Sequence, residues 1–240
     1  MVAIDERFTQ TNTRETHMGN GHTTFDAAPS KHAGVLDASA GITAEHATSP
    51  TTADALTERS VKTWSAGDYD RIAAGFREEA AEFITRLALA PGQRVLDAAC
   101  GSGNLTIPAA RTGASITGFD LVPGLLSAAQ AWAEREGLDV TFDQGSAEEL
   151  PYADASFDVV TSMFGVMFAA RPERVAAELA RVTRSGGRLA LATWPREGFI
   201  GQMLARHMAY MPTKSAVPSP LFWGDESVVR ERLAGRDWSR

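Results

Sequence analysis

Residues 94–121 read RVLDAACGSGNLTIPAARTGASITGFDL, in which two apolar runs end in Asp97 and Asp120 and a glycine-containing turn lies between them. The runs predict two neighbouring strands, so that one carboxylate lies at the tip of each strand. Small residues in the turn let a ligand approach the backbone closely, and the first amides of the next helix can bind an anion. A ligand that has a cationic part, a carboxylate and a ribose would suit this arrangement.

Length and composition limit the classes of protein to which the chain can belong. Its 240 residues, 44% of them hydrophobic, suffice for one good core, and a second full domain is not expected. The net charge of −7 argues against binding DNA or RNA, because such binding depends on clustered Lys and Arg. A small-molecule partner fits better, and the oligomeric state stays open.

The expected location is the cytoplasm. Cys100 is the only cysteine, so no intrachain disulfide can form and a reducing compartment is favoured. The N-terminal residues do not combine basic side chains with an apolar core, and no apolar stretch approaches the roughly 18 residues of a membrane span. We therefore expect a soluble protein that does not act at a membrane.

The N-terminal quarter differs in composition from the rest of the chain. Residues 1–58 are rich in Thr, Ala, Ser, Gly and His and have no sustained apolar period, so they cannot bury enough surface to offset the entropy of ordering. We predict a disordered tail over 1–58 and one domain over 59–240. No metal site is expected in the tail, because its histidines lack acidic or cysteine partners at ligand spacing. These histidines are His17, His22, His32 and His46.

Strands and helices alternate after the tail. Predicted strands cover 94–100, 114–121, 139–144, 156–163 and 187–194, and predicted helices cover 69–90, 105–112, 123–137, 172–183, 199–211 and 225–234. Repeated strand–helix units predict an α/β fold with a doubly wound, mostly parallel sheet and helices on both faces. Ligands bind such sheets beyond the carboxyl ends of the strands, which is where Asp97 and Asp120 lie.

Two kinds of nucleotide cofactor compete for the glycine-containing turn. A dinucleotide fingerprint requires a third glycine at the position of Thr106 and does not require a carboxylate at the end of the first strand. Asp97 and Thr106 therefore disfavour an NAD-dependent oxidoreductase, which remains the less favoured alternative. The glycines of Gly101-Ser102-Gly103 are by themselves a weak signal.

Four segments resemble, in order, the motifs of class I S-adenosylmethionine-dependent methyltransferases. They are VLDAACGSG (95–103), GFDL (118–121), GSAEELPYADASFDVV (145–160) and SGGRLALATW (185–194). The resemblance covers about residues 64–235 and is closest to the small-molecule group of the ubiquinone/menaquinone type, methyltransferase type 11. It implies a Rossmann-like fold, S-adenosylmethionine as cofactor and methyl transfer to a small molecule. A non-catalytic S-adenosylmethionine-binding protein is a further alternative.

The resemblance also implies roles for individual residues. Asp97 would face the positive methionyl end of the cofactor, and Asp120 would accept hydrogen bonds from both ribose hydroxyls. Asn104 would cap the helix after the turn. The other implied cofactor-binding positions are Tyr69 in a covering segment that also contains Trp64, Ala98, Ala99, Cys100, Gly101 and Gly103 around the methionyl part, Leu121, Ser146 and Ala147 at the adenine, and Met163 and Phe164 after the fourth strand.

Two of these positions depart from a simple assignment. Ser146 stands where the family commonly has Asp, so the adenine amino group would donate to a neutral acceptor, which makes a bond weaker by roughly a factor of two. Cys100 has no histidine placed by the sequence to activate it, so we interpret it as a small residue of the turn and not as a nucleophile.

Large apolar side chains in the C-terminal half predict an apolar, aromatic or polyketide-like acceptor. They occur in 162–168 and at Trp194, Phe199, Met203, Met208, Met211, Phe222 and Trp223. Methyl transfer can rely on orientation and exclusion of water, so a base is optional and no catalytic residue is assigned. His207 and Tyr210, on a helix expected to cover the site, are the candidates for removing a proton.

The C-terminal segment is shorter than the resemblance implies. Related proteins finish the sheet with a sixth strand and an antiparallel seventh, but only residues 237–240 follow the last predicted helix. We expect a sheet without those two strands, or a chain cut before them. The edge of the fifth strand would then be exposed and open to a partner.

Overall fold

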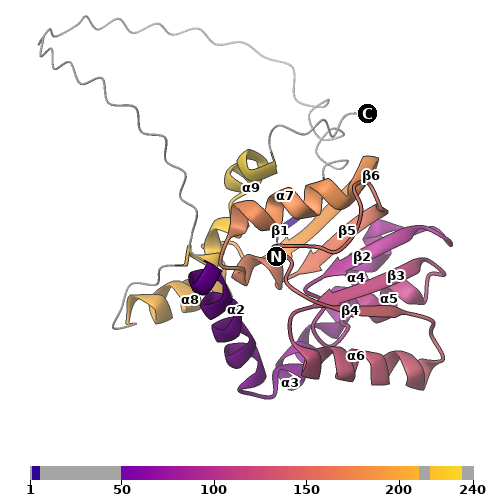
Figure 1. Cartoon of the computed structure of the whole chain (residues 1–240), viewed down its shortest axis with the longest axis horizontal. Coiled ribbons are helices and arrows are strands. Elements are labelled where there is room, and N and C mark those ends of the chain that lie inside the picture. Colours follow the sequence, from indigo (N-terminus) through magenta and orange to yellow (C-terminus); the bar gives the residue numbers. More distant parts are fainter. Residues whose placement is uncertain (1, 6–49, 211–216, 234–240) are drawn as a thin grey trace, which may run out of the picture.

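The computed structural model describes residues 2–5, 50–210 and 217–233 (Figure 1). This part of the chain contains a six-stranded sheet in the order β1-β6-β5-β2-β3-β4. Five strands run parallel, namely β2 (Arg94–Ala98), β3 (Ser115–Asp120), β4 (Thr141–Gln144), β5 (Phe157–Met163) and β6 (Thr183–Thr193). The sixth, β1 (Val2–Asp5), pairs antiparallel with β6. The predicted doubly wound, mostly parallel sheet is confirmed.

Helices cover both faces of the sheet, as predicted (Figure 1). Their bounds are α4 (Arg77–Leu87), α5 (Thr106–Ala110), α6 (Pro123–Glu136), α7 (Pro172–Val182) and α9 (Glu226–Leu233). On one face α5 contacts α4, α6 and β3, and on the other α7 contacts β5, β6 and α9. Right-handed crossovers put the helices that follow β2 and β5 on opposite faces, because the chain moves from these strands in opposite directions along the sheet.

The core is centred on β2 and β5, which run side by side in the middle of the sheet. Val95 pairs with Val159 and Leu96 with Val160, and all four side chains are fully buried. A parallel strand that is covered on both faces needs an unbroken apolar run, which is what these two segments have. The central strands therefore hold their carboxyl ends, including Asp97, in fixed positions.

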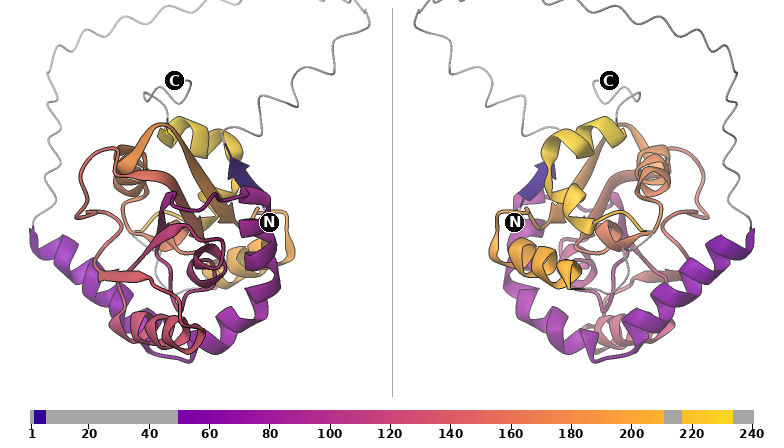
Figure 2. Two further views of the ribbon diagram at one scale, coloured as in Figure 1. Left: turned by 90° about the vertical axis from the view of Figure 1, so that its right-hand side faces the viewer. Right: turned by 90° about the vertical axis from the view of Figure 1, so that its left-hand side faces the viewer.

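A helical cover precedes α4. It consists of α2 (Pro50–Ser65) and α3 (Tyr69–Ala73), followed by a 3-10 turn at Ala74–Phe76. Figure 2 shows α2 as a diagonal helix beside the sheet. The ring of Trp64 meets the rings of Tyr69 and Phe168 at centroid distances of 5.3 and 4.9 Å. Trp64 thus fastens α2 both to α3 and to the segment that follows β5.

Two described elements lie within the stretch that was predicted to be a disordered tail. They are β1 and the first half of α2, which begins at Pro50. The structure therefore differs from the prediction at both ends of the stretch. Residues 6–49, with the four histidines, lie outside the described residues, and there the tail stays a prediction.

The sheet edge beside β6 also differs from the expectation. Within the described ranges, β6 is followed by α8 (Phe199–Ala209), a 3-10 turn at Pro220–Gly224 and α9, and by no further strand. The expected exposed edge of β6 is wrong, because β1 pairs along it from Val2↔Thr193 to Asp5↔Ala190. In the same ranges, no helix is long and apolar enough to span a bilayer.

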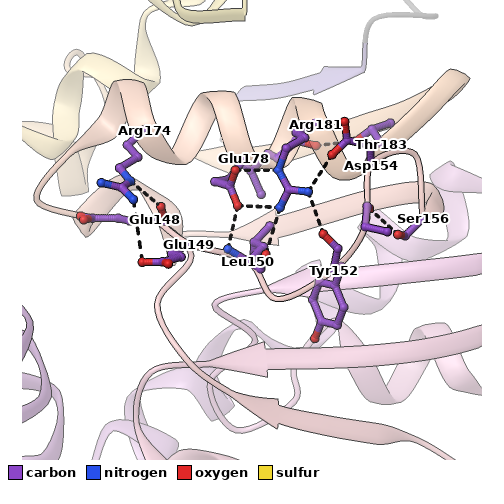
Figure 3. A network of polar contacts seen from close by, with 12 residues as sticks. Glu148, Glu149, Leu150, Tyr152, Asp154, Ser156, Arg174, Glu178, Arg181 and Thr183 are labelled. Carbon is purple, nitrogen blue, oxygen red and sulfur yellow. Dashed lines mark hydrogen bonds and ion pairs between the residues drawn. The ribbon is translucent and has the colours of Figure 1, made fainter.

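A network of polar contacts holds the loop between β4 and β5 against α7 (Figure 3). The Arg181 guanidinium donates to the carbonyl oxygens of Leu150 and Tyr152 at 2.9 and 2.7 Å. It also donates twice to the carboxylate of Glu178, at 2.7 Å each, and that carboxylate accepts from the Leu150 amide at 2.8 Å. Loop backbone polar groups that would otherwise lack partners are satisfied by α7, so the loop has a defined position.

We predict that Arg181→Ala lowers the free energy of unfolding by about 2 kcal/mol, because it removes hydrogen bonds between charged groups and leaves the mostly buried Glu178 without its cation. Urea denaturation followed by circular dichroism measures the change. The matched control is Arg86→Ala, which removes an exposed ion pair with Glu82 and should cost at most about 0.5 kcal/mol. Equal losses in the two variants would contradict the role of Arg181.

Candidate functional site

A cavity lies beyond the carboxyl ends of the central strands, under the cover. Its volume is about 1160 Å³, part of which is open to solvent. The walls come from the segments that follow β2, β3, β4 and β5, and from α2 and α3. Ligand sites of doubly wound sheets occur at this edge, where the chain leaves neighbouring strands in opposite directions.

Most of the predicted cofactor-binding residues line this cavity together. They are Tyr69, Asp97, Ala99, Cys100, Gly101, Asn104, Asp120, Leu121, Ser146, Ala147, Met163 and Phe164. Ala98 and Gly103 are not in its lining. Ala98 is fully buried in β2, and a side chain at Gly103 would meet the Cβ of Ala129 on α6 at 3.3 Å. These two residues therefore serve packing around the site.

The glycine turn, residues 99–103, is shaped by hydrogen bonds to Asp120. The Asp120 carboxylate accepts from the amide of Gly101 at 2.8 Å and from the amide of Val122 at 2.9 Å. Gly101 and Gly103 have φ values of +56° and +96°, in the region that favours glycine. Each Asp120 oxygen uses one lone pair on the backbone, so both oxygens can still accept from a ligand.

Ala99 takes the same left-handed conformation without being a glycine, with φ of +56°. A Cβ on Gly165 would lie 2.5 Å from the Cβ of Ala99 and 2.6 Å from its carbonyl oxygen. Only a glycine at 165 therefore allows the segment after β5 to approach the turn this closely.

The side chain of Asp97 is buried, so its carboxyl group has almost no contact with solvent. Burial raises the pKa of this carboxyl to about 7, against the hydrogen bond from Thr106, and the charge of Asp120 raises it further. The Thr106 hydroxyl donates to one carboxylate oxygen at 2.6 Å. Burial also raises the pKa of Asp120, against its bonds to backbone amides. Two acids held in one apolar setting favour a ligand that brings positive charge.

Two more polar atoms at the turn have no hydrogen-bond partner in the described part of the chain. Ser102 Oγ and Asn104 Oδ1 are both buried, and both residues line the cavity. The predicted helix cap by Asn104 is wrong, because α5 has no side-chain cap and the Asn104 amide nitrogen donates to the Ala73 carbonyl at 2.6 Å. Buried acceptors without partners fit a ligand that carries N–H donors.

Cys100 and Tyr69 are both kept in their protonated forms. Burial and the charges of Asp97 and Asp120 raise the pKa of the Cys100 thiol well above its usual range. Burial and the charge of Asp120 likewise raise the pKa of the Tyr69 phenol. A protonated thiol is a poor nucleophile, which agrees with Cys100 acting as a small residue of the turn.

The loop after β4 forms the wall at the predicted adenine end. The Ser146 hydroxyl accepts from the amide of Glu148 at 3.3 Å. The buried Glu148 carboxylate accepts from the backbone amide and the guanidinium of Arg171, at 2.9 and 2.5 Å. Glu148 is therefore neutralised by a cation from the start of α7, and the wall carries no free charge there.

An aromatic cluster forms the other side of the cavity. Trp64, Tyr69, Phe76, Phe164 and Phe168 line it, and Trp194 supports it from behind. The Trp194 ring stacks on Phe164 at 4.3 Å with an interplanar angle of 17°. Such a wall offers flat apolar faces to a bound molecule.

The C-terminal residues predicted for the acceptor side do not reach the cavity. His207 and Tyr210 are exposed on and just after α8, and neither lines the cavity. Phe199, Met203 and Phe222 are exposed as well, Met208 is half-buried away from the lining, and Trp223 lies in the core. Met211 is outside the described residues. The expectation that α8 covers the site is wrong, because α2 and α3 occupy that place.

The predicted covering segment at Trp64 and Tyr69 lines the cavity, but sequence reasoning missed the part of α2 that precedes Trp64. Leu56, Thr57, Ser60 and Trp64 line the cavity from one face of this helix. Their spacing of three and four residues is the available signal, but Thr and Ser at such positions give little apolar periodicity. In the described part of the chain, no three His, Cys, Asp or Glu side chains are grouped so that they could hold a metal ion.

Comparisons with known proteins agree with this geometry. Residues 96–191 match the methyltransferase domain family. A protein of Mycobacterium tuberculosis, which is itself uncharacterized, is 43% identical over 184 residues, 76% of this chain and 66% of its own length. The demethylmenaquinone methyltransferase of Renibacterium salmoninarum is 37% identical over 116 residues, 48% of this chain and 47% of its own length. The chain thus spans less than two thirds of these relatives.

One solved structure extends the likeness to the fold. The S-adenosylmethionine-dependent methyltransferase of Thermotoga maritima aligns with a TM-score of 0.53 and 22% identity, over 74% of this chain and 79% of its own. Together with the family match, this confirms the resemblance to class I methyltransferases and their Rossmann-like fold. The match covers the glycine turn and both strand-tip carboxylates.

Proposed function

We propose that this chain, whose residues 96–191 belong to the methyltransferase domain family, binds S-adenosylmethionine and transfers its methyl group to a small apolar acceptor. The observation that carries the proposal is the pair of buried carboxylates, Asp97 and Asp120, at two strand tips on either side of the glycine turn. We further expect the protein to act in the cytoplasm, since its one cysteine gives no disulfide.

The residues of the cavity suit the parts of this cofactor in turn. Asp97 would attract the positive methionyl end, and the partnerless oxygens of Ser102 and Asn104 would accept from its ammonium group. Asp120 would accept from the ribose hydroxyls with the lone pairs that its backbone bonds leave over. Ser146 would accept from the adenine amino group.

The acceptor would occupy the part of the cavity between α2 and the segment that follows β5. Leu56, Trp64 and Phe168 are its large apolar side chains, and Thr57 and Ser60 add hydroxyl groups. None of the lining residues that α2 and the segment after β5 contribute to this part carries a charge. A neutral acceptor with a flat apolar body fits such a wall best.

The bound cofactor supplies an activated methyl group on a sulfonium centre. The chain then has to orient the acceptor and exclude water, which the cover and the aromatic cluster can do. Tyr69 keeps its proton because of its raised pKa, so it can donate a hydrogen bond but is a poor base. No catalytic base is proposed.

The direct test is calorimetric titration of the full chain with S-adenosylmethionine and with NAD. We expect binding of S-adenosylmethionine and none of NAD, and the reverse result would favour an oxidoreductase. Release of S-adenosylhomocysteine is then measured with a panel of phenols and naphthoquinols. Cofactor binding with no turnover across the panel would favour a non-catalytic S-adenosylmethionine-binding protein.

Cofactor affinity should depend on pH through Asp97. Its carboxyl has a pKa of about 7 in the free protein, and a cationic ligand favours the ionised form. Lowering the pH from 8 to 6 protonates the carboxyl before binding, so affinity should fall by roughly tenfold. Calorimetry across this range measures it. Asp97→Asn should bind more weakly at pH 8, and the pH dependence of its affinity should reflect only the titration of the ligand's own groups. If its pH profile equals that of the wild-type protein, Asp97 does not attract the cationic end of the cofactor.

The adenine end can be tested by restoring the acid that the family commonly carries there. Ser146→Asp should tighten S-adenosylmethionine binding about fivefold, because a charged acceptor replaces a neutral one. Ser146→Ala is the matched control and should weaken it, since the acceptor is removed. Equal affinities in all three proteins would show that the adenine does not contact position 146.

A further inference from the structure

Asn104 joins the glycine turn to the cover. It follows the turn directly, is half-buried and lines the cavity. Its side-chain nitrogen donates to the carbonyl oxygen of Ala73 at 2.6 Å, across 31 positions of sequence. Ala73 is the last residue of α3, so this bond attaches the cover to the cofactor end of the site.

The orientation of the Asn104 amide follows from the chemistry of its partner. A backbone carbonyl can only accept, so the NH₂ group has to face Ala73. The oxygen Oδ1 then points elsewhere, is buried, and has no partner in the part of the chain that the structure describes. An acceptor left in this state destabilises the ligand-free protein, and a donor on a ligand would remove this cost.

The α3 helix contacts the turn at a second place. The Tyr69 ring lies over Gly101, with its Cε1 atom 3.6 Å from the position that a Cβ of Gly101 would occupy. The same ring meets Trp64 of α2. Tyr69 of α3 therefore contacts both the turn and α2.

We propose that Asn104 is a positioning residue. It couples ligand binding at the methionyl end of the cavity to the closed position of the cover, α2 and α3; this rests on the proposed function. A ligand N–H that donates to Oδ1 fixes the side-chain rotamer and polarises the amide, which strengthens the bond from its nitrogen to Ala73. The coupling is reciprocal, so the closed position of the cover also favours ligand binding.

Hydrogen–deuterium exchange of the full chain, with and without saturating S-adenosylmethionine, tests the coupling. In the wild-type protein the ligand should slow exchange of amides in residues 69–76 by about fivefold, a factor at the lower end of the usual coupling between two linked sites. Asn104→Leu keeps a similar volume but removes both polar atoms. We expect it to bind more weakly and, when saturated, to show less than about twofold slowing of these amides.

Ser102→Ala is the matched control, because it removes the other partnerless oxygen of the turn and leaves the bond to Ala73 intact. It should lower the affinity but keep the fivefold slowing at saturation. Asn104→Asp is the second variant, which retains Oδ1 and loses the donor; it should lose the slowing as Asn104→Leu does. If either Asn104 variant shows wild-type slowing when saturated, the proposal is overturned.

The proposed function and the coupling can fail separately. If the wild-type protein does not bind S-adenosylmethionine, the proposed function fails and the coupling to this ligand fails with it. If binding is normal and the ligand slows exchange equally in wild-type and Asn104→Leu proteins, only the coupling fails. Faster exchange of residues 69–76 in the ligand-free variant would independently support the bond to Ala73.

Discussion

The hydrogen bonds from the amides of Gly101 and Val122 to the Asp120 carboxylate are the constraint on which the site depends. They tie the turn after β2 to the tip of β3, so the distance between the two strand ends is fixed by the chain and not by a ligand. The glycines of the turn permit the positive φ values that this geometry needs, and Gly165 lets the end of β5 approach as well. Three strand tips thereby form one rigid wall.

This wall is built at an electrostatic cost. Asp97 and Asp120 are both buried and their pKa values are raised, chiefly by loss of solvent. Two buried acids destabilise a fold unless hydrogen bonds or cations compensate for them. Hydrogen bonds from Thr106 to Asp97 and from backbone amides to Asp120 compensate for part of this cost. A cationic ligand would compensate for the rest. This electrostatic cost indicates a functional role for the two acids, because apolar residues at these positions would stabilise the fold better.

The sheet, the strand tips and most of the cofactor wall could be predicted because their signals are local. Asp97 and Asp120 follow unbroken apolar runs, and parallel strands bring such ends together whatever the helices do. The role of α8 could not be predicted, since an amphipathic pattern shows that a helix has an apolar face but not which neighbour that face meets. His207 was misplaced for this reason. Leu56 and Ser60 were missed because α2 is rich in Thr and Ser and lacks the apolar period of a core helix.

The same composition explains how α2 can serve as a cover. A helix that buried a wide apolar stripe would be held on the sheet at all times, and the cavity beneath it would be closed to a ligand. In α2, by contrast, none of the described side chains, residues 55–65, is buried; the Trp64 ring meets Tyr69 and Phe168, and Thr57 and Ser60 line the cavity. Because its described side chains are at most half-buried, opening α2 should cost less free energy than unfolding the core. The rigid wall of strand tips therefore binds the ligand, and the weakly held helix above it controls access to the cavity.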